Sequence, residues 1–119
     1  MLDHVAIPVR DLDASRKFYE PLFDRLGAKV MMEWPGGALF GTDDGMVALR
    51  QSEDVMPMHV AFRTTDRSSV DSFHETALAG GASDNGAPGV RADYHEHYYA
   101  AFVIDPDGHN IEAVCHRSE

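Results

Sequence analysis

The sequence predicts an α+β fold made of two βαβββ modules, and two observations lead to this prediction. The first is an internal repeat, because residues in the first half recur fifty-five positions later, as in His4/His59 and Phe18/Phe73. The second is the order of patterns in each half, where a strand is followed by a helix and then by three short strands. We therefore expect one domain assembled from two copies of one structural unit.

The domain is expected to span residues 1–119, with the first module at about 1–52 and the second at about 56–117. A short polar link at 52–55 joins the modules and is too short to separate independent domains. Neither module alone can enclose a two-sided core. We expect their sheets to pair into a curled mixed sheet with the helices outside and a cavity inside.

Each module opens with an apolar strand, at 2–9 and at 56–63, and continues into a helix. Asp11 and Asp66 are the expected N-caps, because their carboxylates can accept the unpaired amide hydrogens of the first helical turn. Apolar residues then recur at helical spacing. In the first helix these are Phe18, Leu22 and Leu26, in the second Val70, Phe73 and Ala77, and glycines at 27 and 80–81 end the two helices.

Pro21 conflicts with the first helix, because it lacks a backbone donor and crowds the carbonyl of Lys17. We expect a kink or an early end there. Three short strands then complete each module, separated by turn sequences rich in Asp, Pro and Gly. The expected strands are 29–34, 38–41 and 46–51 in the first module and 83–90, 99–104 and 110–116 in the second.

Composition narrows the classes of function. Twenty acidic residues against ten basic ones give a net charge of −10, which disfavours binding to nucleic acid or to anionic lipid. No apolar run is long enough to cross a membrane, so no membrane partner is expected. The single cysteine, Cys115, cannot form an internal disulfide and is expected to be a packed thiol in a cytoplasmic protein.

Alternation along the strands predicts which side chains face the cavity. In the first strand of each module the alternate apolar residues should pack on the helix, which turns His4 and His59 to the inner face. In the last strand Ile111 and Ala113 suit the helix side, which turns Glu112 inward. A carboxylate in an otherwise apolar strand is costly to bury unless it is paired.

His4, His59 and Glu112 together form a competent ligand set for one divalent metal ion, with Fe, Mn, Zn, Ni and Co all open. Positions left for water or substrate would allow catalysis. A single histidine at the start of a strand is most often structural. The repetition of that histidine in both modules favours the metal site.

The opening Asp3-His4-Val5-Ala6-Ile7 and the segment from Asp105 to Glu112, DPDGHNIE, closely resemble the vicinal oxygen chelate superfamily. That superfamily includes glyoxalase I, bleomycin-resistance proteins, fosfomycin-resistance thiol transferases and extradiol dioxygenases. The resemblance implies a glyoxalase-like fold and a fourth ligand position on the last strand of module one. Aligning Asp44-Gly45 with Asp107-Gly108 sets Leu49 at that position, which disfavours a standard glyoxalase reaction.

Four reactions or roles stay open on this basis. The first two are a lyase or isomerase and a thiol transferase, each acting on a small molecule with vicinal oxygens. The third is an extradiol-type dioxygenase. The fourth is a resistance protein that binds a drug or metabolite without chemistry. The family also uses both intrachain pairing and exchange between subunits, and we expect a homodimer.

The second module carries extra residues before its last strands, including the cluster Tyr94, His95, His97 and Tyr99. This segment is either a loop over the cavity that supplies catalytic acids, bases or phenols, or an aromatic edge strand or subunit contact.

The expected roles of the other polar residues follow from the face of the strand or helix on which each one lies. Arg63 and Asn110 lie on the expected inner face, where Arg63 pairs with an anionic substrate or with an internal carboxylate. His109 is expected to be structural in or beside the turn, and His74 to be solvated on its helix. The methionines, including Met31 and Met32, are expected as core filler.

Overall fold

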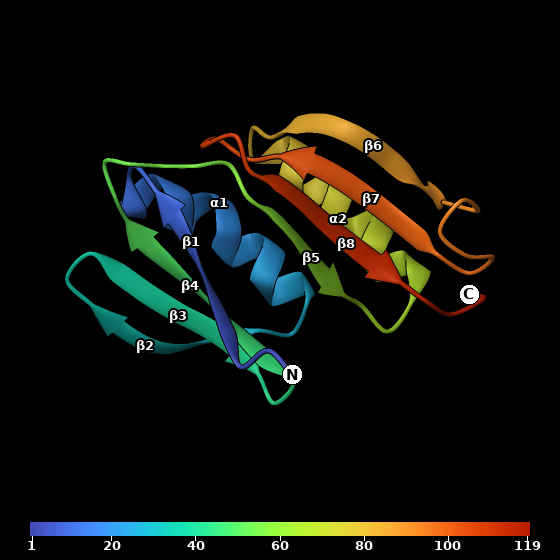
Figure 1. Cartoon of the computed structure of the whole chain (residues 1–119), viewed down its shortest axis with the longest axis horizontal. Coiled ribbons are helices and arrows are strands. Elements are labelled where there is room, and N and C mark those ends of the chain that lie inside the picture. The colour runs from blue at the N-terminus through green and yellow to red at the C-terminus, as the bar shows by residue number, and fades with distance from the viewer. The chain divides into compact units, whose positions relative to one another are not determined.

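The computed structural model describes residues 1–119, which form two compact units, Met1–Met56 and Pro57–Glu119 (Figure 1). The first unit contains β1 (His4–Val9), α1 (Leu12–Arg25), β2 (Lys29–Trp34), β3 (Gly37–Thr42) and β4 (Gly45–Gln51). The second contains β5 (His59–Arg63), α2 (Arg67–Ala79), β6 (Ser83–Val90), β7 (Tyr99–Ile104) and β8 (Asn110–Cys115). Both units are βαβββ, so the predicted fold class is confirmed.

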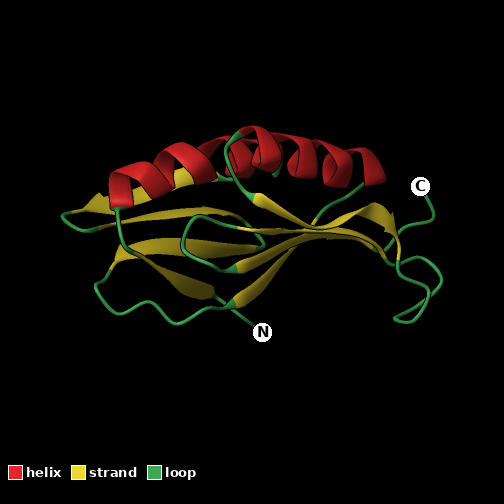
Figure 2. Ribbon diagram, turned by 90° about the horizontal axis from the view of Figure 1, so that it is seen from above, coloured by secondary structure: helices red, strands yellow, loops and turns green.

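Each unit has one mixed sheet of four strands. The strand orders are β1-β4-β3-β2 and β5-β8-β7-β6, with the first and last strands of each unit parallel and the other pairs antiparallel. In each unit the helix packs on one face of that unit's own sheet (Figure 2). The opposite face of each sheet is therefore the face that can present polar side chains.

The helices begin and end as the sequence predicts. Asp11 Oδ1 accepts a hydrogen bond from Ala14 N at 3.0 Å, and Asp66 Oδ1 accepts one from Ser69 N at 2.8 Å, which confirms both N-caps. Gly27 and Gly81 follow the two helices with φ of +78° and +102°, a backbone conformation that glycine adopts without steric cost. The repeat therefore preserves the local signals that delimit each helix.

Pro21 does not end α1, which continues to Arg25. Of the kink or early end expected there, the early end is wrong, because Phe18, Leu22 and Phe23 are almost completely buried and hold the helix on the sheet. Pro21 itself is exposed, so the carbonyl that loses its helical partner is on the solvent side. Tertiary packing outweighs the cost of about 3 kcal/mol that a proline carries inside a helix.

The strand register corrects the alignment of the fourth ligand position. In the first unit Ala6 pairs with Ala48, and in the second Ala61 pairs with Glu112. The counterpart of Glu112 is therefore Ala48, one residue before the predicted Leu49. Leu49 is fully buried and pairs with Ile7 on the helix side. The position still carries no carboxylate.

Other side chains differ from expectation in burial. His74 is buried, and its Nε2 lies 2.9 Å from Asp84 Oδ1, because α2 turns this face of the helix toward β6. Met31 and Met32 are exposed on β2 and do not fill the core. Two predictions are confirmed: Cys115 is buried, and His109 is structural, since its Nδ1 accepts from Met58 N at 2.9 Å.

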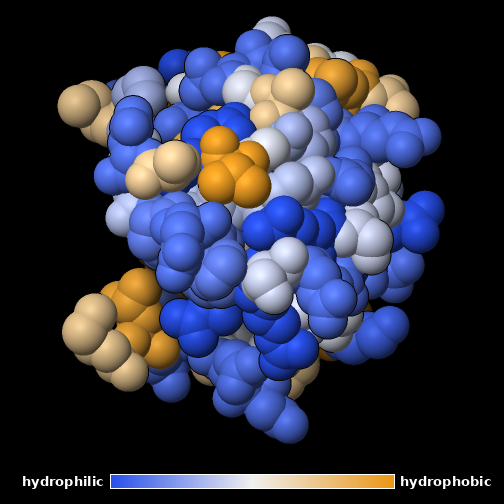
Figure 3. Space-filling view, turned by 90° about the vertical axis from the view of Figure 1, so that its right-hand side faces the viewer, coloured by the Kyte–Doolittle hydropathy of each residue, from blue (hydrophilic) through white to orange (hydrophobic).

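The face drawn in Figure 3 is mostly hydrophilic, with hydrophobic residues in small separate groups. None of the helices has the length and the apolar character needed to cross a membrane.

Candidate metal and substrate site in the second unit

His59 and Glu112 meet on the face of the second sheet that is opposite α2. β5 and β8 are parallel neighbours, with His59 beside Asn110 and Ala61 beside Glu112. His59 Nε2 lies 2.8 Å from Glu112 Oε1, and the side chains are 53% and 2% exposed respectively. A buried carboxylate is thus paired with an imidazole that is open to solvent.

Tyr98 holds the second oxygen of Glu112. Its hydroxyl donates a hydrogen bond to Glu112 Oε2, so the two oxygens have different partners. Phe102 pairs with Glu112 across β7 and β8, and its ring centroid lies 6.2 Å from that of His59. An aromatic surface therefore borders the pair on the β7 side.

Partial burial and the hydrogen bond to Glu112 raise the pKa of Tyr98 well above the usual value for a phenol. The anionic phenolate is disfavoured both by desolvation and by the adjacent carboxylate. Tyr98 therefore keeps its proton near neutral pH and acts as a donor that orients Glu112.

His4 belongs to the first unit, where it is the first residue of β1. Its Nδ1 lies 2.6 Å from Asp3 Oδ1, and the side chain is 59% exposed. This contact leaves Nε2 as the ring nitrogen available for a ligand, and a carboxylate on the other nitrogen is a common partner of a metal-binding histidine.

The segment from Arg91 to Tyr98 is a loop made of turns between β6 and β7, not an edge strand. Arg91 N donates to Tyr98 O at 2.7 Å and closes the loop. The ring of Tyr94 meets that of Tyr98 edge-on, with centroids 4.8 Å apart. His95 accepts at Nδ1 from the backbone N of His97 at 3.0 Å.

The structure also places His116 against this loop, just beyond β8. His95 Nε2 and His116 Nδ1 lie 2.7 Å apart, and the two rings stack with centroids 5.0 Å apart. The ring of Tyr98 meets both imidazoles edge-on. His95, through His116, and Tyr98, through Glu112, thus connect the loop to β8 and the residue that follows it.

Tyr99 lies on the helix side of the sheet, which corrects its placement beside the cavity. Its hydroxyl donates to Asp71 Oδ1 at 2.6 Å, and Arg67 lies over its ring. The reason is strand alternation, because Tyr99 shares a face with Ala101 and Val103. That same alternation is the signal that identifies Tyr98 as the inward tyrosine.

The two predicted substrate contacts lie on the same face as Glu112. Asn110 pairs with His59 in register, and its Oδ1 accepts from Asn85 Nδ2 at 3.2 Å. Arg63 pairs with Val114, two residues beyond Glu112 on β8. His116, which the sequence analysis did not consider, continues the Glu112 and Val114 alternation and could have been found from it.

The geometry of the pair is compatible with a shared metal ion. Two neighbouring ligands at the usual distance of about 2.1 Å from one ion lie about 3 Å apart. The 2.8 Å between His59 Nε2 and Glu112 Oε1 is close to that spacing. Imidazole nitrogen and carboxylate oxygen suit Fe, Mn, Zn, Ni or Co. No three His, Cys, Asp or Glu side chains are grouped as a complete metal site in the structure.

Comparison with known proteins adds relatives of similar length. The chain is 28% identical to the uncharacterized protein YqjT of Bacillus subtilis, over 96% of this chain and 98% of that protein. It is 25% identical to a glyoxalase/bleomycin resistance protein from Albidiferax ferrireducens, with a TM-score of 0.85 over 97% and 98% of the two chains.

A third relative shows the same fold at lower identity. This is an E126Q mutant of the fosfomycin resistance protein FosX from Listeria monocytogenes, solved with Mn(II) and 1S,2S-dihydroxypropylphosphonic acid. It is 19% identical, with a TM-score of 0.71 over 96% of this chain and 88% of that one. The family model described as Glyoxalase/Bleomycin resistance protein/Dioxygenase superfamily matches residues 1–113, and the chain therefore belongs to that superfamily.

Proposed function

We propose that this protein is a divalent-metal-dependent enzyme that acts on a small molecule with vicinal oxygens, as a lyase or isomerase or as a thiol transferase. The observation that carries the proposal is the contact between His59 and Glu112. The carboxylate is almost fully buried, whereas the imidazole at 2.8 Å from it is half exposed on an open sheet face. Such a pair can take an ion from solvent and leave positions for a substrate.

His59 Nε2 and Glu112 Oε1 are the proposed ligands in the second unit, and on the basis of the internal repeat we propose His4 as the third. When bound, the ion would act as a Lewis acid toward the vicinal oxygens of the substrate. The structural relative FosX, which was solved with Mn(II), supports a metal in this fold.

The surrounding residues have distinct proposed roles. Tyr98 fixes the orientation of Glu112 through Oε2 and leaves Oε1 for the ion. Asn110 and Arg63 are the proposed substrate contacts, because both lie on the open face beside the ligands. The loop residues Tyr94, His95 and His97 are the proposed source of proton transfer. A histidine is suited to that role because its ordinary pKa is near neutral.

The proposal is tested by loading the dialysed protein with each of Mn²⁺, Fe²⁺, Co²⁺, Ni²⁺ and Zn²⁺ and screening turnover of epoxides and 2-oxoaldehydes with and without a thiol. Thiol-dependent turnover would support the transferase or lyase chemistry. Oxygen consumption with catechols would instead assign a dioxygenase. Tight binding of compounds without turnover under any metal would assign a binding protein.

His59→Ala and Glu112→Gln are the decisive variants, and Glu75→Gln is the matched control, an exposed carboxylate on α2. We expect metal-dependent turnover to be lost in the first two and retained in the control. Turnover that is equal in all four proteins would contradict the assignment. A metal affinity that rises with protein concentration would indicate that His4 comes from a second copy in a homodimer.

A further inference from the structure

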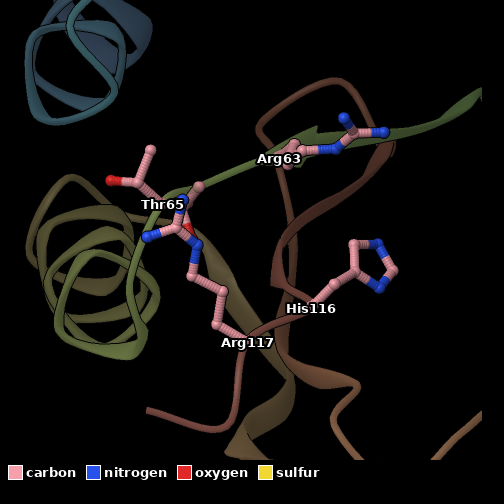
Figure 4. Close-up of a pocket in the computed structure, with 5 residues that line it drawn as sticks. Arg63, Thr65, His116 and Arg117 are labelled. Atoms are coloured by element: carbon pink, nitrogen blue, oxygen red, sulfur yellow. The ribbon is translucent and has the colours of Figure 1, made fainter.

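A second feature of the same sheet face is a pocket of about 460 Å³ at the end of β5 and β8. It is lined by Arg63, Thr64, Thr65, His116 and Arg117 (Figure 4). Two of these side chains are cationic, one is an imidazole, and none is acidic. The chain as a whole has a net charge of −10, so a pocket lined by two arginines and no acidic residue differs from the average charge of the protein.

Arg63 presents an uncommitted guanidinium. It is exposed, and it forms no ion pair or side-chain hydrogen bond within its unit. Arg63 therefore does not pair with a carboxylate of its own sheet, which was one of the two expectations for this residue. A guanidinium has donors in a fixed planar fork that matches the oxygens of a carboxylate, phosphonate or phosphate.

His116 presents a second donor, and its tautomer follows from its neighbours. The backbone N–H of His97 donates to His95 Nδ1, so the proton of the neutral His95 ring is on Nε2. That Nε2–H donates to His116 Nδ1 at 2.7 Å. The neutral His116 ring therefore carries its own proton on Nε2, where it can donate to a ligand.

Arg117 lines the pocket from another direction. In Figure 4 the side chains of Arg63 and His116 extend to one side, whereas Arg117 extends to the side of Thr65. Its backbone oxygen accepts from Arg67 of α2 at 3.3 Å. Hydrogen bonds from Ser69 and Ser68, and more weakly the charge of Arg117, lower the pKa of Asp66. The charge of Arg117 is thus partly balanced by the cap of α2.

We propose that the Arg63 guanidinium and His116 Nε2–H form an anion subsite that binds a carboxylate, phosphonate or phosphate group of the substrate. That the anion belongs to a substrate of the His59–Glu112 centre rests on the function proposed above. Arg63 lies two residues along β5 from Ala61, the partner of Glu112, so the two sites are about 7 Å apart along the strand. The substrate class is therefore a small anion whose vicinal oxygens lie a few bonds from its charged group.

The test is calorimetric titration of the EDTA-dialysed full chain with methylphosphonate, inorganic phosphate and acetate in turn. Arg63→Gln is expected to weaken binding about tenfold or more, and His116→Ala about three- to tenfold. Arg117→Gln removes the same charge from the same pocket and is expected to weaken binding less than threefold. The preferred probe among the three identifies the charged group.

Two results would overturn the subsite. One is the absence of millimolar or tighter binding of all three probes to the wild type. The other is an equal loss in Arg63→Gln and Arg117→Gln, which would indicate only a diffuse positive field. Circular dichroism and thermal melting of each variant confirm that a loss of binding is not a loss of folding.

Glu112→Gln separates the subsite from the metal centre. Anion binding is expected to persist in this variant without metal, while its metal content falls. Loss of anion binding in Glu112→Gln with an intact fold would place the anion at the metal centre and contradict the subsite. Anion binding that depends on Arg63 in a protein without metal affinity would uphold the subsite and reject the proposed metal enzyme.

Discussion

The two units share the residues that build the fold and differ in those that can carry chemistry. Both begin their helix with an aspartate cap and follow it with a glycine at positive φ. Along the parallel strand pair, however, Ala48 in the first unit stands where Glu112 stands in the second. The repeated histidine is present in both, so the first unit contains one of the proposed ligands and the second contains two.

The pockets at the ends of the parallel strands differ in the same way. The pocket of the first unit, about 490 Å³, is lined by Arg10, Gln51, Ser52 and Glu53, so a cation and an anion are both present. By strand register, Ser52 and Glu53 are the counterparts of His116 and Arg117. At these two positions the first unit has a hydroxyl and a carboxylate, whereas the second has an imidazole and a guanidinium.

The loop that contacts His116 belongs only to the second unit. The offset between matched positions grows from 55 at the first strands to 64 at the last strands, so the second unit is nine residues longer in between. The added length includes the loop that carries His95 and leads into Tyr98. The two units therefore share one scaffold, and most of the residues proposed to bind a metal ion or an anion lie in the second unit.

The largest expected effect comes from variants that test which residue of β4, Ala48 or Leu49, is the counterpart of Glu112. Leu49→Glu should reduce the free energy of unfolding by about 4 kcal/mol or more, because it removes a buried leucine and adds a charge against α1. Ala48→Glu, on the opposite face, should cost about 2 kcal/mol. Urea denaturation at neutral pH measures both. A larger loss in Ala48→Glu would contradict the register that equates Ala48 with Glu112.

The next effect concerns the tyrosine that distinguishes the second unit. Tyr98→Phe should lower metal affinity about ten- to a hundredfold, because a residue that orients a ligand typically contributes that much. Tyr99→Phe is the matched control, since its hydroxyl binds Asp71 on the helix side. We expect the control to change metal affinity less than threefold. Equal losses in the two variants would remove the positioning role of Tyr98.

The smallest effect concerns a feature that both units share. Hydrogen bonds from Ser69 and Ser68 lower the pKa of Asp66, so this carboxylate stabilises the fold above its unfolded pKa of about 3.9. The contribution is lost as the pH falls through the lower folded pKa. Thermal melting of wild type and Asp66→Ala should therefore differ at pH 6 and converge near pH 2. A difference that grows in acid would contradict the ionised cap.

Much of this comparison could be predicted from the sequence, because it depends on local signals. The caps at Asp11 and Asp66 follow from side-chain chemistry, and the inward direction of His59 and Glu112 follows from strand alternation. Aligning the turn residues sets Leu49 opposite Glu112, but a one-residue difference between the two turns moves a strand position to the opposite face. Only the pairing of Ala6 with Ala48 corrects it.

Tertiary contacts explain the remaining differences. Pro21 stays inside α1 because of packing that a propensity scale does not include. His74 is buried because β6 places Asp84 beside it, and its helix position alone does not reveal this partner. His95 lies against His116 although the two residues are twenty-one positions apart, and strand alternation alone does not reveal this contact. Each of these features depends on residues that the chain brings together only on folding.

The central claim is that Glu112 and His59 hold a divalent ion in the second unit. The most direct measurement is the metal content of wild type, Glu112→Gln and Glu75→Gln after equal loading with Mn²⁺ and gel filtration, read by mass spectrometry. We predict close to one ion per site in the wild type and in Glu75→Gln, and little in Glu112→Gln. Equal metal content in all three proteins would contradict the claim.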